Sequence, residues 1–211
     1  MPEHTIKLPK ELIDSYEKFE NNITDRLNDF KNIKTELIFY EFCFCIMTPQ
    51  TKAKSAWLVQ NRLIEKDFKN TKFNPAYILA DKKHYIRFHN VKTQRLINAI
   101  NYKERLEKIL LLNIDQYEKR KIIKTEFVGI GMKEASHFLR NIGYKQLAII
   151  DRHILKMLVK CGVLDNPKPP NNDKQYLEIE LKIINFANEI NIDMDILDLL
   201  LFAHSNGEVL K

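Results

Sequence analysis

Apolar residues recur every three or four positions through nearly the whole chain, and this spacing constrains the fold more than any other feature. The longest pattern follows Pro9, which we place at a first helical position. From Leu12 to Phe30 its apolar residues line one face of a helix of about five turns. No stretch alternates convincingly as a half-buried strand would. The sequence therefore predicts an all-α protein with about nine to eleven helices.

The segment 36–47, ELIFYEFCFCIM, is apolar nearly all round, which predicts a central buried helix with Thr35 as its cap. A loop rich in proline and asparagine is expected over 165–173, DNPKPPNND. Further helices are expected from residue 51 onward and over 75–80, 91–112, 115–124, 132–142, 152–161, 174–190 and 194–205.

Composition limits the class of protein. The chain has 211 residues, of which 45% are apolar and 29% charged, as in a soluble globular protein with one large or two small domains. It contains no apolar run long enough to span a membrane, and MPEHTIKLPKEL lacks the features of a secretory signal. We therefore expect a cytoplasmic location and no membrane association. The net charge of +6 is compatible with a polyanionic partner, but also with an ordinary solvated surface.

The cysteines predict neither disulfides nor a metal site. The chain has three, Cys43, Cys45 and Cys161, and they lack the spacing of metal ligands. Two of them lie in the apolar run FYEFCFCIM. We interpret all three as reduced thiols in the core.

A pair of glycines marks the most constrained backbone in the chain. There are five glycines, and none precedes Gly129. Gly129 and Gly131, in VGIGMKEA, stand between two amphipathic segments, 115–124 and 132–142. Glycine accepts positive φ, so such a turn can direct free amides and a helix N-terminus toward an anion such as phosphate. An ordinary connection between helices is the alternative.

Lys133 lies two residues after Gly131, in the first turn of the expected helix. The positive end of the helix dipole disfavours an additional positive charge there. If the side chain is also desolvated, we expect the pKa of its amine to fall below its reference value of about 10.4 and the amine to become a usable nucleophile. The alternative is an exposed surface lysine.

Asp151 is placed to cap the helix expected over 152–161, with Gly162 just past its end. One helix and one loop separate it from Lys133, and this distance can return a carboxylate to the vicinity of the amine. A plain N-cap aspartate is the alternative. The glycine turn, the amine and the carboxylate together favour a chemical site.

FVGIGMKEA followed by IIDRH resembles the helix-hairpin-helix and Gly/Pro-Asp signature of the DNA base-excision glycosylase superfamily, in its bifunctional branch with a hairpin lysine. The resemblance implies two helical subdomains with a DNA-binding cleft between them. Residues 30–118 would form a helical barrel, and residues 1–29 with 119–211 would form the helix-hairpin-helix subdomain that carries the catalytic residues.

The same resemblance assigns roles to individual residues. Gly129 and Gly131 would form the turn that binds a DNA phosphate, Lys133 would be the amine nucleophile, and Asp151 the catalytic carboxylate. Val128 departs from the pattern, because many members have proline at this position.

The branch within the superfamily follows from the cysteines and the C-terminus. The endonuclease III type generally holds an iron-sulfur cluster on four C-terminal cysteines, whereas only Cys161 follows residue 45 here. The alkyl-base branch typically lacks the hairpin lysine. The chain is similar to archaeal-type 8-oxoguanine DNA glycosylases, which end in a short helix and a terminal lysine, as DILDLLLFAHSNGEVLK does. YIRFHNVK and MTPQT, at 85–92 and 47–51, also resemble this class.

For base recognition, the resemblance points to Phe88 and Phe202 as aromatic residues that sandwich the flipped base, and to Lys211 as the group that reads its edge. Phe202 stands where a tryptophan is expected in this class. A phenylalanine at helical spacing is more often a core residue, and chain ends are usually frayed.

Two further residues are expected to bind DNA. Gln50, at the start of a helix after Pro49, could enter the gap left by the flipped base; the alternative is a polar residue that only begins the helix. His153 would support Asp151 or bind a phosphate. His89 is interpreted as a surface residue.

The resemblance implies a bifunctional DNA N-glycosylase and AP lyase that excises 8-oxoguanine through a lysine Schiff base and β-elimination. It would act as a monomer on double-stranded DNA containing oxidised guanine, with no metal or organic cofactor. Two alternatives remain open: a lysine-dependent glycosylase for another oxidised base, like endonuclease III without its cluster, and a non-catalytic helix-hairpin-helix DNA-binding protein.

Overall fold

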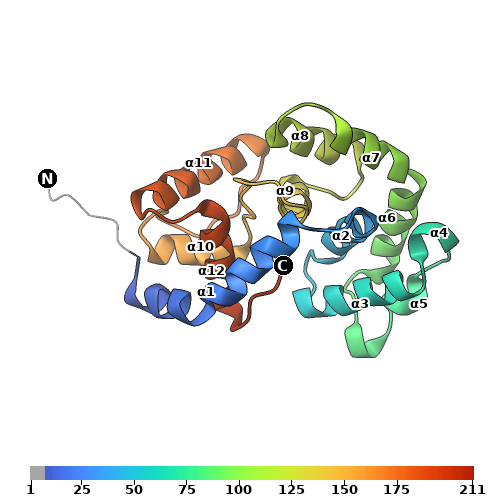
Figure 1. Cartoon of the computed structure of the whole chain (residues 1–211), viewed down its shortest axis with the longest axis horizontal. Helices are drawn as coiled ribbons and strands as arrows, with labels where there is room; N and C mark the ends of the chain where they lie inside the picture. The colour runs from blue at the N-terminus through green and yellow to red at the C-terminus, as the bar shows by residue number, and fades with distance from the viewer. Residues whose placement is uncertain (1–7) are drawn as a thin grey trace, which may run out of the picture. The chain divides into compact units, whose positions relative to one another are not determined.

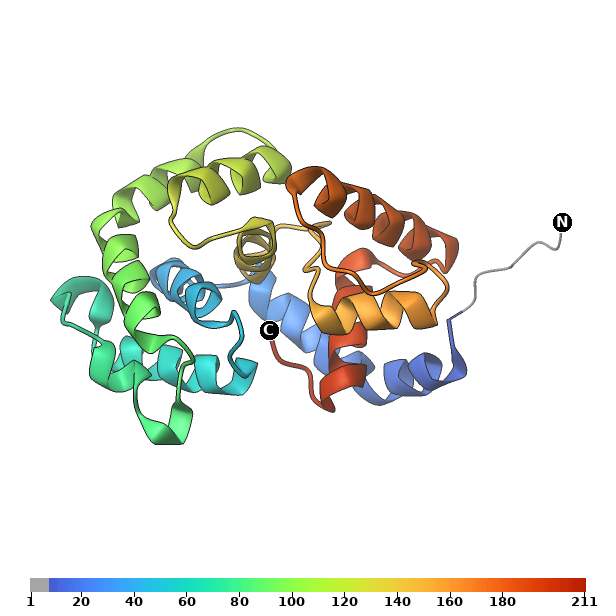
Figure 2. The same cartoon turned by 180° about the vertical axis from the view of Figure 1, so that it is seen from behind.

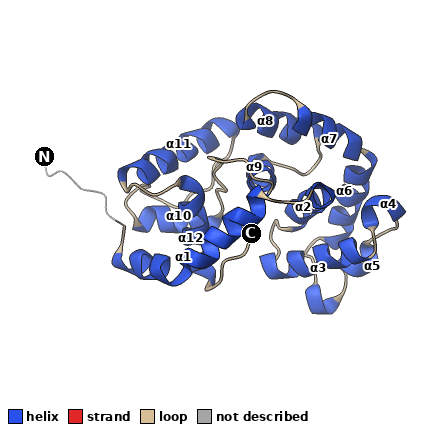
Figure 3. Ribbon diagram, in the orientation of Figure 1, coloured by secondary structure: helices blue, strands red, loops and turns tan. Residues whose placement is uncertain are grey.

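The computed structural model describes residues 8–211, and all regular secondary structure in this range is helical (Figure 3). The all-α prediction is confirmed. Residues 1–7, part of the segment examined for a targeting signal, lie outside the described residues. In chain order the elements are α1 Lys10–Lys31, α2 Thr35–Met47, α3 Ala53–Glu65, α4 Phe68–Thr71, α5 Ala76–Leu79, η1 Lys82–His84, α6 His89–Asn101, α7 Lys103–Leu111, α8 Gln116–Glu126, α9 Met132–Asn141, α10 Arg152–Lys160, α11 Asp173–Glu189 and α12 Met194–Asn206.

The chain folds into two compact units. The first comprises residues 1–32 and 143–211, and the second comprises residues 33–142. The division falls after residue 142 rather than near residue 118, because α9 packs on both α8 and α2 and therefore belongs with the second unit. The predicted subdomains, 30–118 and the remainder, followed from the family resemblance, and that division stays a prediction.

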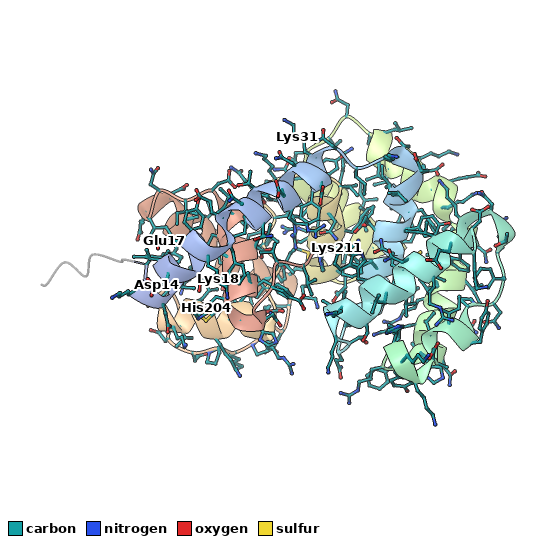
Figure 4. All side chains as sticks on the ribbon, turned by 60° about the horizontal axis from the view of Figure 1, so that its bottom comes forward. Asp14, Glu17, Lys18, Lys31, His204 and Lys211 are labelled. Carbon is teal, nitrogen blue, oxygen red and sulfur yellow. The ribbon has the colours of Figure 1, made fainter. Side chains whose placement is uncertain are left out.

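The first unit is built on the pairing of α1 with α12, on which α10 and α11 also pack (Figures 1 and 2). The predicted apolar face of α1 is buried against α12, and Val209 from the C-terminal tail packs on the same cluster. A polar contact adds to this pairing, because Nδ1 of His204, the α12 residue labelled in Figure 4, lies 2.8 Å from Ser15 Oγ of α1. The buried cluster consists of Phe19, Ile23, Phe30, Leu199, Leu200 and Ala203.

The second unit surrounds α2, which packs against α3, α6 and α9. Every residue of α2 from Phe39 to Met47 is buried, so the predicted central helix is confirmed. Glu41 is among them, and its carboxylate accepts hydrogen bonds at 2.9 Å from Gln60 Nε2 and Asn141 Nδ2. These bonds offset the cost of burying a charged group. They also tie α2 to α3 and to α9.

The structure has more helices than the sequence predicts. The single helix expected over 91–112 is interrupted at Tyr102, whose φ of −107° and ψ of 16° separate α6 from α7. The short elements α4 and η1 were not expected, because they are too short to show a periodic pattern. α4 is also bounded by left-handed residues, Asp67 and Lys72, with φ of 49° and 51°.

Two predicted helix starts are each shifted by one residue. Pro9 is the residue that precedes α1 rather than its first helical residue, and its carbonyl accepts hydrogen bonds from the Leu12 and Ile13 amides. Thr35 is the first residue of α2, with Lys34 in the capping position and no capping bond from a side chain. Thr35 as a cap was therefore wrong. Helix ends depend on local backbone angles, which apolar spacing does not determine.

The predicted state of the cysteines is confirmed: all three are free and buried. Burial is the main cause that raises the pKa of the Cys161 thiol to about 11. A buried thiol with a raised pKa is a poor nucleophile. In the described part of the chain, no helix combines the length and apolar character needed to cross a bilayer.

Candidate active site

The hairpin between α8 and α9 is held by its apolar residues. Phe127 and Ile130 are buried, and the Phe127 ring packs edge-on against Phe42 of α2 with 4.8 Å between centroids. The Ile130 amide donates to the Phe127 carbonyl at 3.1 Å, which closes the turn. Val128 at its tip is 73% exposed. The predicted turn therefore exists, and its tip faces solvent.

Gly129 has two reasons to be glycine. Its φ of +86° lies in the left-handed region, which side chains disfavour. A Cβ at this position would also lie 2.2 Å from Nε of Arg95, which comes from α6. The guanidinium of Arg95 therefore lies directly against the hairpin backbone, where it adds a positive charge beside the turn.

Lys133 lies in the first turn of α9, and its side chain is 26% exposed. Its Nζ is 3.1 Å from Oε1 of Glu134. The other carboxylate oxygen of Glu134, Oε2, accepts a hydrogen bond from the Gly131 amide at 3.1 Å. One carboxylate therefore contacts both the hairpin backbone and the candidate nucleophile. In the resting arrangement, Lys133 is ion-paired and only partly exposed.

A second lysine, Lys92 of α6, contributes to the electrostatics of this region. Its side chain is almost completely buried, with 2% of the residue exposed. Burial and, to a smaller extent, the positive charges of Arg95 and Lys133 together lower the pKa of the Lys92 ammonium to about 8, against the opposing effect of Glu134. Arg95 and Lys133 therefore place positive charge at the hairpin, as a site for a polyanion requires, whereas the Lys92 ammonium is buried and donates to protein oxygens.

Asp151 caps α10 as predicted. Its Oδ1 accepts hydrogen bonds from the amides of His153, at 2.7 Å, and Ile154, at 2.9 Å. Neither bond uses Oδ2. The carboxylate is thereby fixed at the helix N-terminus, where the dipole favours negative charge.

His153 accepts a hydrogen bond at Nε2 from Nε of its neighbour Arg152, at 3.3 Å. His153 touches Asp151 only through its backbone amide in the contacts found among residues 8–211. Its proposed role toward DNA stays a prediction.

Gln50 and Phe88 share an unusual backbone conformation. Gln50 is exposed between α2 and α3 with φ of 55°, and Phe88 is 50% exposed just before α6 with φ of 59°. Non-glycine residues in this region concentrate at functional sites. The Arg87 guanidinium lies 5.0 Å from the centroid of the Phe88 ring.

The other two base-recognition candidates lie in the first unit. Phe202 is half-buried on α12, and its carbonyl accepts a hydrogen bond from Asn206 Nδ2 at 2.8 Å. Lys211, labelled in Figure 4, ends a tail in which Val209 packs on the α1–α12 cluster and Leu210 is buried. The tail is therefore anchored up to its last residue.

The predicted site residues divide between the two units. Gln50, Phe88, Gly129, Gly131 and Lys133 belong to the unit formed by 33–142, while Asp151, His153, Phe202 and Lys211 belong to the other. Between residues 8 and 211, no group of three or more His, Cys, Asp or Glu side chains is arranged to hold a metal ion.

Three residues of this region were missed from the sequence: Lys92, Arg95 and Glu134. Lys92 is in helical register with Leu96, on the apolar face of α6, and a charged residue on such a face was the available signal. Glu134 stands three residues after Gly131, which is the spacing of a capping box. For Arg95, no signal in the sequence pointed to Gly129.

The chain is similar to known proteins over most of its length. The family model for 8-oxoguanine DNA glycosylase matches residues 23–192. The 8-oxoguanine DNA glycosylase/AP lyase of Fusobacterium nucleatum is 35% identical over 206 residues, covering 93% of this chain and 94% of the relative. The protein of the same name from Sulfolobus acidocaldarius is 32% identical, covering 92% of this chain and 96% of the relative.

A solved structure is similar over the same length. The crystal structure of the Methanocaldococcus jannaschii 8-oxoguanine glycosylase/lyase, in complex with 15mer DNA containing 8-oxoguanine, matches with a TM-score of 0.82 and 31% identity. The match covers 95% of this chain and 99% of that chain. With its family model, relatives and fold in agreement, the chain belongs to the 8-oxoguanine DNA glycosylase family.

Proposed function

We propose that this protein excises 8-oxoguanine from double-stranded DNA and then cleaves the strand at the abasic site. The observation that carries the proposal is the position of Lys133 in the first turn of α9, directly after the hairpin. A DNA-binding module needs only the hairpin, whereas a partly exposed amine at its mouth supplies a nucleophile. The relatives named 8-oxoguanine DNA glycosylase/AP lyase support the same pair of activities.

DNA binding begins at the hairpin in this proposal. The Gly129 amide and the Arg95 guanidinium bind a phosphate and so set the register of the protein on the duplex, while the Ile130 and Gly131 amides, which donate to Phe127 and Glu134, fix the turn. The complex of the M. jannaschii relative with DNA containing 8-oxoguanine supports DNA with oxidised guanine as the partner. The protein is proposed to act as a monomer on the DNA of the cell.

The damaged base must leave the stack before its glycosidic bond can be reached, at a cost of roughly a few kcal/mol. Gln50 would fill the gap that the base leaves. Phe88 and Phe202 would stack on the extruded base, and Lys211 would read its edge through the side chain or the terminal carboxylate. In this proposal, the residues that recognise the base are different from those that break the glycosidic bond.

The chemical step starts when Lys133 leaves its ion pair with Glu134 and gives up a proton to Asp151. The neutral amine attacks C1′, and the bond from C1′ to the base breaks. Its electron pair leaves with the base, which takes up the proton held by Asp151. As an ionised carboxylate, Asp151 then stabilises the positive charge that develops on the sugar as the base leaves. The Lys133 nitrogen, now bonded to C1′ and positively charged, gives a proton to Asp151 and regains its lone pair.

Strand cleavage follows from the same nitrogen. Its lone pair opens the C1′–O4′ bond, O4′ takes up a proton, and a Schiff base forms between Lys133 and C1′. Loss of a proton from C2′ then expels the 3′ phosphate by cleavage of the C3′–O bond. Water hydrolyses the remaining Schiff base and releases the enzyme. No metal or organic cofactor takes part in these proposed steps.

Borohydride trapping on a duplex containing 8-oxoguanine tests the proposal. The native protein should form a covalent adduct, and Lys133→Gln should form none. Lys121→Gln, which changes an exposed lysine of α8, is the matched control and should trap normally. Absence of a native adduct, or an undiminished adduct with Lys133→Gln, would refute the Schiff-base mechanism. A stronger adduct on a thymine glycol duplex would instead assign the enzyme to another oxidised base.

A further inference from the structure

The turn that carries Gln50 is held in an unfavourable conformation. Gln50 lies between α2 and α3, is exposed, and has φ of 55°. The left-handed conformation is unfavourable for a non-glycine residue. Such a residue keeps this conformation only where its surroundings impose it.

Lys92 supplies the contacts that surround this residue. Its Nζ donates hydrogen bonds to the Met47 carbonyl at 2.7 Å, to the Pro49 carbonyl at 2.6 Å and to Thr51 Oγ1 at 2.9 Å. The three acceptors lie on both sides of Gln50 in the chain. One buried ammonium therefore fixes the whole turn while leaving the Gln50 side chain exposed.

The backbone of Lys92 reaches Phe88, another exposed residue with positive φ. Its amide donates to the Phe88 carbonyl at 3.0 Å, in the first turn of α6. Lys92 therefore connects the turn that carries Gln50 to the turn that carries Phe88. Both side chains belong to the proposed recognition surface, and both lie in the unit formed by 33–142.

Helix capping alone does not distinguish Lys92, because a second buried lysine, Lys119, caps another helix in the same way. Lys119 donates to the carbonyls of Ile109, at 3.3 Å, Leu110, at 2.8 Å, and Leu112, at the C-terminal end of α7. Both ammonium groups satisfy terminal carbonyls and complement a helix dipole. The difference is that the segment held by Lys92 contains a left-handed, exposed glutamine.

We propose that Lys92 is a positioning residue that holds Gln50 in its left-handed conformation, so that the glutamine side chain can enter the duplex as the damaged base leaves the stack. The inference rests on the proposed function. Lys92 itself does not touch the reacting atoms. Its loss should slow base extrusion, which needs Gln50, more than cleavage of a pre-formed abasic site, where no damaged base has to be removed from the stack.

A double-mutant cycle tests whether Lys92 acts through Gln50. Single-turnover rates are measured for native protein, Lys92→Met, Gln50→Ala and the double variant, on an 8-oxoguanine duplex and on an abasic-site duplex. We expect Lys92→Met to lower the 8-oxoguanine rate about tenfold in the native background and less than about twofold in the Gln50→Ala background. The abasic-site rate should change by less than about threefold.

A purely structural role predicts another result. Loss of general stability would lower the rate by the same factor in both backgrounds and on both substrates, and that outcome overturns the inference. No effect of Lys92→Met in the native background also overturns it. A native protein that cleaves neither substrate refutes the proposed function and this inference with it, whereas cleavage with additive effects refutes only the inference.

Two further variants separate folding from positioning. Lys119→Met removes the comparable buried lysine and should lower stability without any dependence on Gln50. Thr51→Val removes one acceptor of the Lys92 ammonium with little change in shape. If Lys92→Met does not fold, the same cycle with Thr51→Val and Gln50→Ala should show the same non-additivity, and additive effects there overturn the inference.

Discussion

The Glu134 carboxylate lies 3.1 Å from the amine of Lys133 and also accepts a hydrogen bond from the Gly131 amide. This contact joins the proposed nucleophile to the turn that would bind the phosphate. It also holds the amine in an ion pair, which has to break before attack on the sugar. Glu134 therefore has two separable effects, one on the geometry of the turn and one on the charge of the amine.

We expect Glu134→Gln to accelerate Schiff-base formation at neutral pH by about two- to fivefold, because this partly exposed ion pair contributes about 1 kcal/mol. The glutamine oxygen can still accept from the Gly131 amide, so the turn is retained. Glu134→Ala removes both contacts and should slow the reaction instead. Rates of borohydride trapping on an abasic-site duplex measure both variants. Equal rates for Gln and Ala variants would contradict the separation of the two effects.

Gly129→Ala should destabilise the protein by about 1–2 kcal/mol through the left-handed backbone. It should also weaken duplex binding, because its Cβ displaces Arg95 from the hairpin. Gly162→Ala is the control, since Gly162 has φ of +74° but no atom within 4 Å of the added Cβ. Urea unfolding should show a similar loss of stability for both variants. Fluorescence anisotropy should show weaker duplex binding for Gly129→Ala only. Equal binding by both variants would exclude the contribution of Arg95.

The pKa of Lys92, lowered to about 8 by burial and by Arg95 and Lys133, makes stability depend on pH. Between pH 8 and the ordinary lysine pKa of about 10.4, the unfolded chain binds a proton that the folded protein has released. The free energy of unfolding should therefore rise over this range for native protein relative to Lys92→Met. Urea titrations of both proteins at pH 7, 8, 9 and 10 measure the difference. A difference that stays constant would contradict the lowered pKa.

Deletion of Lys211 should reduce discrimination between 8-oxoguanine and guanine while leaving cleavage of a pre-formed abasic site nearly unchanged. Val209 and Leu210 keep the tail anchored in the variant. Glu208→Ala, a change at an exposed residue of the same tail, should affect neither activity. Single-turnover rates on three duplexes, with 8-oxoguanine, guanine or an abasic site, provide the measurement. An equal loss on all substrates would refute a role in base recognition.

Features that depend on residues close together in the sequence could be predicted from the sequence. The buried character of α2 follows from its composition, and the cap of α10 follows from Asp151 and the amides just after it. The hairpin follows from the position of Gly129 and Gly131 between two amphipathic helices. The break at Tyr102 was missed, because apolar spacing continues across it and only the backbone angles change.

The sequence by itself determined the helical class, the hairpin turn and the helix starts at which Lys133 and Asp151 stand, since spacing and capping act over a few residues. Only the tertiary structure decided that Arg95 lies against Gly129. It also decided that the Lys92 ammonium holds the turn after α2, where it donates to the carbonyl of Met47, 45 residues earlier in the chain. Such contacts join segments far apart in the chain, and their geometry depends on how α2, α6 and the hairpin pack. A buried charge can be satisfied by partners anywhere in the chain, so its partners are known only once the fold has formed.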